Sequence, residues 1–235
     1  MKLVRLTDNV CMVQWDGEGR FNKQFIADFN QLLDTILSDE NIKVLITTGT
    51  GKIYSNGLDL QEIIKDADLP PHEFLNQYYL PMLARFLTLP VVTVASVQGH
   101  AFAGGMVLAL AHDIVVMNGE KGYLSMNEIL LPGPIPIGMA EVVRARMPNL
   151  RTTMDCMLLA KRFTGTEAYE LGIVDSITNL EELQDMAVKM GIAYLKTYNN
   201  RLVVASIKEK IHTRALYALT EKEPASSFSH VNSKI

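Results

Sequence analysis

Two glycine-rich stretches are the first residues of this sequence whose type and spacing could support chemistry. The first stretch runs from Gly49 to Gly57 and is followed by Leu58, and the second stretch runs from Gly99 to Gly105. Glycine can adopt a left-handed conformation that turns the next amide outward, and an N–H at a helix start can face an anion. Either stretch alone could be a plain turn or a tight packing contact. The two together predict backbone N–H groups that face a ligand.

Glu128 is the second candidate, because it stands in the otherwise apolar stretch 123–131. A buried carboxylate is unfavourable unless it is paired or used. Desolvation would raise its pKa and suit it to acid–base catalysis near neutral pH. The alternative is a surface glutamate on a loop. His100, beside the second glycine stretch, is a rival base because histidine titrates in this range, although a structural hydrogen bond would also explain it.

Other kinds of site lack their motifs. A phosphate-binding loop would need glycine at Ile46 and serine or threonine at Ile53, and the dinucleotide-binding glycine spacing is also missing. Two cysteines and five histidines show no metal-ligand spacing, so no metal is expected. The net charge of −4 does not indicate nucleic acid as a partner, and no apolar run is long enough for a membrane span.

The helices and strands predicted to position these residues indicate an α/β fold. The chain has 235 residues, 48% hydrophobic and 20% charged, which is enough for one substantial core. A helix with one apolar face is predicted over 22–38, and buried strands are predicted over 43–48 and 91–97. Each of these strands leads into a glycine-rich stretch, and an apolar helix is expected from Met106 to Ala111. The repeated order of strand, glycine turn and helix indicates an α/β fold.

Helices dominate the second half of the sequence. Thr164 and Glu167 form a capping box at the start of a short helix that Gly172 ends. Two longer amphipathic helices are predicted over 181–197 and 201–219, and residues 221–235 are expected to form a loose polar tail. The charged and proline-rich segment 60–81 is expected to be a mobile cover over a site.

In order and spacing, four segments resemble the crotonase superfamily, which contains the enoyl-CoA hydratases and isomerases. They are Ser55–Leu60, the second glycine stretch through Leu110, Asn127–Leu131 and Thr164–Asp175. The resemblance covers roughly residues 1–220. It implies a spiral of β-β-α units with a helical C-terminal trimerisation region. Residues 1–175 would form the core with the acyl-CoA site, and residues 176–235 the C-terminal helical region with its polar tail.

The resemblance also implies roles for individual residues. Leu58 and Gly104 look like the two N–H donors of an oxyanion hole for a thioester carbonyl. The backbone of Ser55, Asn56 and Gly57 looks like the part that holds the adenine end of coenzyme A. The substrate-binding set is completed by Leu60, His100 and Val107. Coenzyme A is then part of the substrate, and no separate cofactor is implied.

The reaction depends on how many carboxylates surround the oxyanion hole. Hydratases of this superfamily carry two glutamates; Glu128 matches the second, while the first falls on Val107. One carboxylate suffices to move a proton from C2 to C4 of a 3-enoyl thioester, and Val107 would help to keep the pocket dry. The Δ3,Δ2-enoyl-CoA isomerases are similar in having an apolar residue there. The sequence therefore predicts an isomerase that forms 2-trans-enoyl-CoA.

Two alternatives to the isomerase are kept. One is an enoyl-CoA hydratase or another crotonase-type lyase or thioesterase, and the other is a non-catalytic acyl-CoA-binding protein. The resemblance implies a homotrimer or a dimer of trimers. The expected compartment is the cytoplasm. The terminal Ser233-Lys234-Ile235 resembles a peroxisomal address, so the peroxisomal matrix is the alternative.

Overall fold

The computed structural model describes residues 1–131, 134–198 and 200–224, and Ser233-Lys234-Ile235 therefore lies outside the described residues. The strands are β1 (Lys2–Arg5), β2 (Val10–Trp15), β3 (Arg20–Phe21), β4 (Val44–Gly49), β5 (Ile53–Ser55), β6 (Gly57–Leu58), β7 (Val92–Val97), β8 (His100–Phe102), β9 (Ile114–Asn118), β10 (Leu124–Ser125) and β11 (Ser176–Thr178). The helices are α1 (Lys23–Ser38), α2 (Leu60–Lys65), α3 (Pro71–Phe74), α4 (Leu80–Leu87), α5 (Gly104–Leu110), α6 (Ile137–Arg146), α7 (Leu150–Met157), α8 (Gly165–Glu170), α9 (Leu183–Ala193), α10 (Arg201–Ile211) and α11 (Thr213–Thr220), with a π-helical turn η1 (Leu75–Tyr79) and 3₁₀ turns η2 (Glu128–Leu130) and η3 (Tyr194–Lys196).

A six-stranded sheet with the order β1-β2-β4-β7-β9-β11 forms the centre of the molecule. Its neighbouring strands run parallel except for the antiparallel pair β1 and β2. Every residue of β4, β7 and β9 is buried, as expected for strands that have helices on both faces. The predicted strands over 43–48 and 91–97 are therefore confirmed.

A second, smaller sheet makes the chain a spiral. After β4, β7 and β9 the chain turns into β5, β8 and β10, and these short strands form a three-stranded parallel sheet in the order β10-β8-β5. The expected unit of strand, glycine turn and helix is thus a unit of two strands and a helix, because each glycine-rich stretch contains a short strand of its own. This β-β-α order places the chain segments that follow β5 and β8 side by side.

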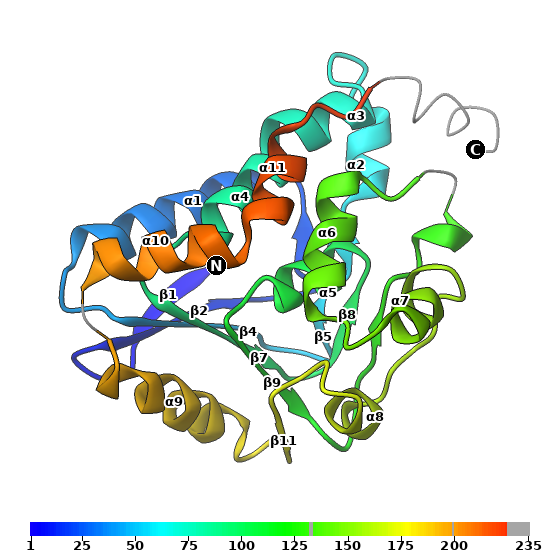
Figure 1. The fold of residues 1–235 in the computed structure, drawn as a ribbon. Coiled ribbons are helices and arrows are strands. Elements are labelled where there is room, and N and C mark those ends of the chain that lie inside the picture. The colour runs from blue at the N-terminus through cyan, green and yellow to red at the C-terminus, as the bar shows by residue number, and fades with distance from the viewer. Residues whose placement is uncertain (132–133, 199, 225–235) are drawn as a thin grey trace.

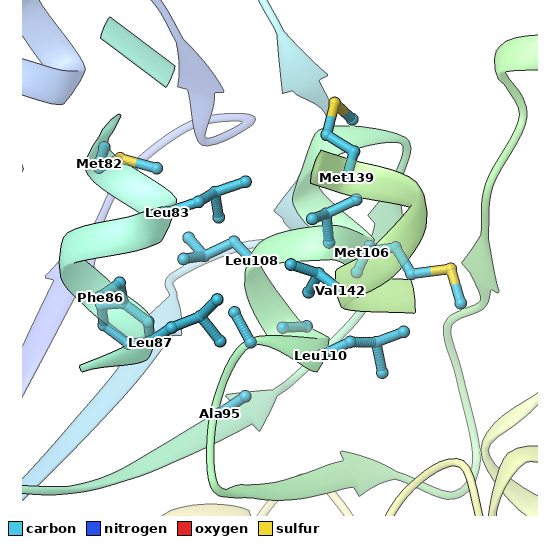
Figure 2. Close-up of a cluster of buried hydrophobic side chains, with 14 of the residues drawn as sticks. Met82, Leu83, Phe86, Leu87, Ala95, Met106, Leu108, Leu110, Met139 and Val142 are labelled. Atoms are coloured by element: carbon cyan, nitrogen blue, oxygen red, sulfur yellow. The ribbon is translucent and has the colours of Figure 1, made fainter. Parts of the chain in front are cut away.

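The large sheet separates two layers of helices (Figure 1). On one face α9 packs Leu183 and Ala187 against side chains of β4, β7 and β9. On the other face α1, α4 and α5 cover the larger core. Figure 2 shows part of this core, where α4, α5 and α6 meet above Ala95 of β7. The side chains labelled on these helices are Met82, Leu83, Phe86, Leu87, Met106, Leu108, Leu110, Met139 and Val142.

The helical second half agrees with the sequence in most places. The capping box of Thr164 and Glu167 is present, and Gly172 follows α8 with a φ of 76°. The helix predicted over 201–219 is wrong in one respect, because the chain breaks at His212 into α10 and α11. The break lets α11 turn away and pack against α6 and α4. Strand β11 adds to the sheet beside β9, while the proposed division at residue 175 stays a prediction.

The start of the expected loose tail is held in place. The Glu223 side chain accepts a hydrogen bond from the N–H of Ile137 at 2.7 Å, and the Glu223 backbone bonds to the Asn76 side chain in both directions. The tail prediction is therefore wrong for Glu223, because a carboxylate at the first turn of α6 satisfies a helix N–H. Within the described residues, no helix combines the length and the apolar character that crossing a membrane requires.

Candidate active site

A cavity of about 820 Å³ lies where the two glycine-rich stretches meet the helices of residues 60–75. Five of the predicted site residues line it. They are Asn56, Leu58, Leu60, Gly104 and Glu128. The segment 60–81, which was expected to cover a site, forms part of the wall through α2, α3 and the turn η1, with Ile63 and Leu75 among the lining side chains. Its mobility stays a prediction.

Close contact between glycines brings the two stretches together. Gly57 has a φ of 75°, and a Cβ atom built on it would lie 2.8 Å from the backbone nitrogen of Gly104. A Cβ atom on Gly105 would lie 2.6 Å from the Cβ of Ser55, and closer still to the Ser55 carbonyl oxygen. Neither stretch could approach the other with a side chain at these positions. The absence of side chains therefore places Leu58, which follows Gly57, beside the start of α5.

The backbone before Gly104 is held in a strained conformation. Ala103 has a φ of 52° and a ψ of −127°, a region that costs a non-glycine residue about 1–3 kcal/mol. Its N–H donates to the Ser125 carbonyl at 2.9 Å, and its carbonyl accepts from the Val107 N–H at 3.1 Å. Gly104 is then the first residue of α5, where the N–H group has no acceptor within the helix. This N–H belongs to a residue that lines the cavity.

Glu128 is the titratable residue in the cavity wall whose pKa is changed by burial. Its side chain is only 8% exposed, and its Oε2 atom has no hydrogen-bond partner among the described residues. Burial raises the pKa of Glu128 to about 7, since desolvation disfavours the charged form. A carboxyl group with such a pKa can both accept and return a proton near neutral pH.

Four predicted site residues lie outside the cavity wall. Ser55 is buried, and its hydroxyl donates to the Gly19 carbonyl at 2.6 Å and accepts from the Gly57 N–H. Gly57 forms the contact described above, and Val107 is fully buried within α5. The His100 ring stacks between Phe102 and Tyr123, with centroids 5.2 and 5.4 Å away. This position does not bring His100 to the cavity as a base.

The cavity also contains residues that the sequence did not indicate. Arg20 and Met139 reach it from β3 and α6, and these two residues follow no local motif that would mark them. Phe102 of β8 also lines the cavity and belongs to the second glycine-rich stretch, although no role was predicted for it. Asn127 also lines it and keeps a buried Oδ1 atom without a partner among the described residues. The proximity of Asn127 to Glu128 in the sequence was a signal that could have identified it. In the described part of the chain, no cluster of His, Cys, Asp and Glu side chains could hold a metal ion.

The sequence is similar to enzymes that act on enoyl-CoA. A model of the enoyl-CoA hydratase/isomerase family matches residues 8–231. Enoyl-CoA delta isomerase 3 of Arabidopsis thaliana is 34% identical, with 84% of this chain and 85% of the relative covered. The peroxisomal enoyl-CoA delta isomerase 1 of the same plant is 30% identical over 90% of this chain and 89% of its own. A probable mitochondrial enoyl-CoA hydratase of Dictyostelium discoideum is 31% identical, with 84% and 68% covered.

Solved structures share the fold at lower sequence identity. An enoyl-CoA hydratase from Mycobacterium ulcerans superposes with a TM-score of 0.82 at 21% identity, covering 99% of this chain and 97% of that protein. A methylmalonyl-CoA decarboxylase superposes with a TM-score of 0.73 at 17% identity, covering 99% and 86%. The α/β spiral of β-β-α units that the sequence predicts is therefore confirmed as a crotonase-type fold.

Gly105→Ala tests the contact between the two glycine-rich stretches. Because the new methyl group would overlap Ser55, we expect the free energy of unfolding to fall by about 1–3 kcal/mol, as for other overpacked sites. Denaturant unfolding measures this change. Gly51→Ala is the matched control, since a Cβ atom there meets nothing within 4 Å. Equal losses in the two variants would contradict the contact.

Proposed function

The chain belongs to the enoyl-CoA hydratase/isomerase family, and from this premise we propose that it converts 3-enoyl-CoA into 2-trans-enoyl-CoA. One observation carries the choice of reaction. Among the described side chains that line the cavity, Glu128 alone carries a carboxylate. A hydratase of this superfamily would carry a second glutamate at the position of Val107, which is apolar and fully buried. A single carboxylate is enough for a proton transfer that begins and ends on the same substrate.

The proposed mechanism uses Glu128 as a proton carrier. The carboxylate removes a proton from C2 of the 3-enoyl thioester, and the electron pair spreads over a dienolate whose charge rests on the thioester oxygen. The protonated Glu128 then returns the same proton to C4, which leaves a double bond between C2 and C3. No water or redox partner is consumed. The pKa of about 7 suits both halves of this transfer, because each form of the carboxyl group is accessible.

Backbone N–H groups would stabilise the charge that develops during this transfer. We assign the thioester oxygen to the N–H groups of Leu58 and Gly104, which both line the cavity. Donors fixed in advance at such a position often supply the largest part of catalysis, and the loss of one typically costs about 10²–10³-fold in rate. The close approach of Gly57 to Gly104 supports the pairing of these two donors.

The remaining wall suits the rest of an acyl-CoA molecule. Ile63, Leu75 and Met139 offer an apolar surface for the acyl chain and help to exclude the water that hydration would need. Arg20 and Lys65 are the cations of the lining, and we assign them to the phosphates of coenzyme A. The adenine end would lie along the backbone of residues 55–57, as the family resemblance implies.

An association of three chains, or of two trimers, fits the exposed apolar side chains around α7. Leu150 is 72% exposed, and Leu158 and Leu159, just beyond α7, are 53% and 60% exposed. Side chains of this kind gather at interfaces that remain buried in the assembly. We expect light scattering of the purified protein to give at least three times the 26.2 kDa chain mass. A monomer mass would contradict the assembly.

The compartment is proposed to be the cytoplasm, with the peroxisomal matrix as the alternative. Two of the Arabidopsis relatives have peroxisomal in their names. The residues that would act as the address, Ser233-Lys234-Ile235, lie outside the described part of the chain.

Glu128→Gln tests the proposed base. We expect wild-type protein to isomerise 3-hexenoyl-CoA and the variant to lose about 10²–10⁴-fold in kcat, because glutamine cannot accept the C2 proton. The measurement is the appearance of 2-hexenoyl-CoA. Glu120→Gln, which changes an exposed glutamate, should leave the rate unchanged. Activity that survives in Glu128→Gln would exclude Glu128 as the base.

The same assay separates the alternatives. A wild-type protein that binds acyl-CoA without turning it over would instead be a non-catalytic binding protein. Faster hydration of crotonyl-CoA than isomerisation of 3-hexenoyl-CoA would show a hydratase.

The pH dependence of kcat/KM gives a further prediction. Because burial raises the pKa of Glu128 to about 7, the carboxyl group is protonated and unable to act as a base at lower pH. We expect kcat/KM for 3-hexenoyl-CoA to rise with pH and to reach half of its plateau near pH 7. Steady-state rates between about pH 4 and 9, with folding checked at each pH, measure the midpoint. A midpoint near pH 4.5, the ordinary value for glutamate, would contradict the buried base.

A further inference from the structure

Tyr79 contacts Gly104, one of the two residues of the proposed oxyanion hole, although Tyr79 itself is not among the residues that line the cavity. It is the last residue of the π-helical turn η1 and is fully buried. Its hydroxyl donates a hydrogen bond to the carbonyl oxygen of Gly104 at 2.6 Å. Short π-helical segments inside α-helices are often found at functional sites. This turn joins the cavity wall, which contains Leu75, to the backbone that would bind the substrate.

The contact at Gly104 is made by two neighbours. A Cβ atom on Gly104 would lie 2.9 Å from the Tyr79 hydroxyl oxygen and 3.5 Å from the Cα of Gly57. The hydroxyl therefore packs directly against the Cα of Gly104, while Gly57 approaches its nitrogen. Ala103, the residue before Gly104, is tied to Ser125 by a hydrogen bond. Gly104 is thus fixed on its N-terminal side by Ala103 and on its C-terminal side by Tyr79.

The hydroxyl is not needed to satisfy the Gly104 carbonyl. Gly104 begins α5, and an α-helix offers each carbonyl the N–H group four residues later. The aromatic ring alone would also fill the space, since it packs against Phe21 with centroids 5.2 Å apart. Burying a hydroxyl is unfavourable unless it finds a partner. A tyrosine at this position therefore adds a directed bond to the carbonyl of Gly104, in addition to the contact with Gly57 and the hydrogen bond of Ala103.

We propose that Tyr79 is a positioning residue that holds Gly104 in the orientation needed to stabilise the enolate oxygen. This inference rests on the proposed function. A glycine has no side chain to limit its φ and ψ, so bonds from its neighbours must keep its N–H directed at the substrate. Donors of an oxyanion hole act through their fixed alignment, and a displacement of about 1 Å can cost on the order of 10²-fold in rate.

The charge state of Tyr79 suits this role. Burial, followed by the nearby Glu128 carboxylate, raises the pKa of Tyr79 well above its ordinary value. The hydroxyl consequently remains a donor when Glu128 becomes ionised to act as the base. Positioning of Gly104 by Tyr79 is thus maintained over the pH range in which the proposed reaction runs.

Tyr79→Phe tests the inference, with acetoacetyl-CoA as the probe. An oxyanion hole favours the enolate of this ligand, which is recognised by its own ultraviolet absorption, so the readout does not require turnover. We expect the enolisation equilibrium of the bound ligand and the kcat for 3-hexenoyl-CoA both to fall about tenfold, a smaller loss than removal of a donor. KM should stay within about twofold, since the cavity wall is unchanged.

Two other tyrosines provide controls. Tyr78→Phe removes the neighbouring hydroxyl, which has no hydrogen bond among the described residues, and should leave both readouts at the wild-type level. Tyr54→Phe removes an equally buried hydroxyl that forms a hydrogen bond with Thr47 at 2.7 Å. The decrease in the unfolding midpoint of this variant shows how much stability the loss of one such bond costs. Tyr79→Phe should lose no more stability than this reference, and all variants are compared well below their unfolding midpoints.

The outcomes distinguish this inference from the proposed function. Unchanged enolisation and kcat in Tyr79→Phe would overturn the positioning role. Should that variant fail to fold, site-specific 4-fluorophenylalanine at position 79 keeps a para substituent in the place of the hydroxyl but donates no hydrogen bond, and its enolisation should fall in the same way; wild-type enolisation in that protein would also overturn the role. Wild-type protein that enolises acetoacetyl-CoA but does not isomerise 3-hexenoyl-CoA would refute the isomerase and leave the Tyr79 comparison valid. Wild-type protein that does not enolise the ligand would overturn both.

Discussion

The approach of one glycine-rich stretch to the other is the constraint on which the rest of the site depends. Gly57 contacts the nitrogen of Gly104, and Gly105 contacts Ser55. These contacts bring together two successive β-β-α units of the chain. Side chains at either contact would push the end of β5 away from the start of α5. The position of Leu58 beside Gly104, and hence any pairing of their N–H groups, follows from this lack of side chains.

The apolar cavity wall is a second constraint, because it determines the properties of the Glu128 carboxylate. Apolar neighbours leave Glu128 almost without solvent, which costs stability whenever the group is charged. The same burial raises its pKa to about 7 and makes it useful as a base near neutral pH. A more polar wall would stabilise the carboxylate and weaken it as a base. The unfavourable burial of Glu128 is therefore understandable if the site is used for proton transfer.

Elements far from the cavity hold its wall in place. Leu219 of α11 packs against Gly138 of α6, where a Cβ atom would lie 2.7 Å from the leucine side chain. Glu223 binds the first N–H of the same helix. Met139 of α6 faces both the core shown in Figure 2 and the cavity. Through these contacts the C-terminal helices position one side of the site, although none of their residues lines it.

The sequence by itself determined the features whose signal is local. Buried strands, the capping box of Thr164 and the glycine-rich stretches are recognisable because a few neighbouring residues fix the backbone there. An isolated Glu128 in an apolar segment likewise indicated its own burial. The spiral fold followed from the resemblance that these segments carry in their order and spacing.

Only the tertiary structure decided which distant residues meet. Arg20 and Met139 reach the cavity, and Tyr79 reaches Gly104, because the packing of β3, α6 and η1 brings them there. No local pattern encodes such contacts, since they depend on the path of the whole chain. The break at His212 is of the same kind: the periodicity of residues 201–219 is helical throughout, and packing of α11 against α6 and α4 required the turn.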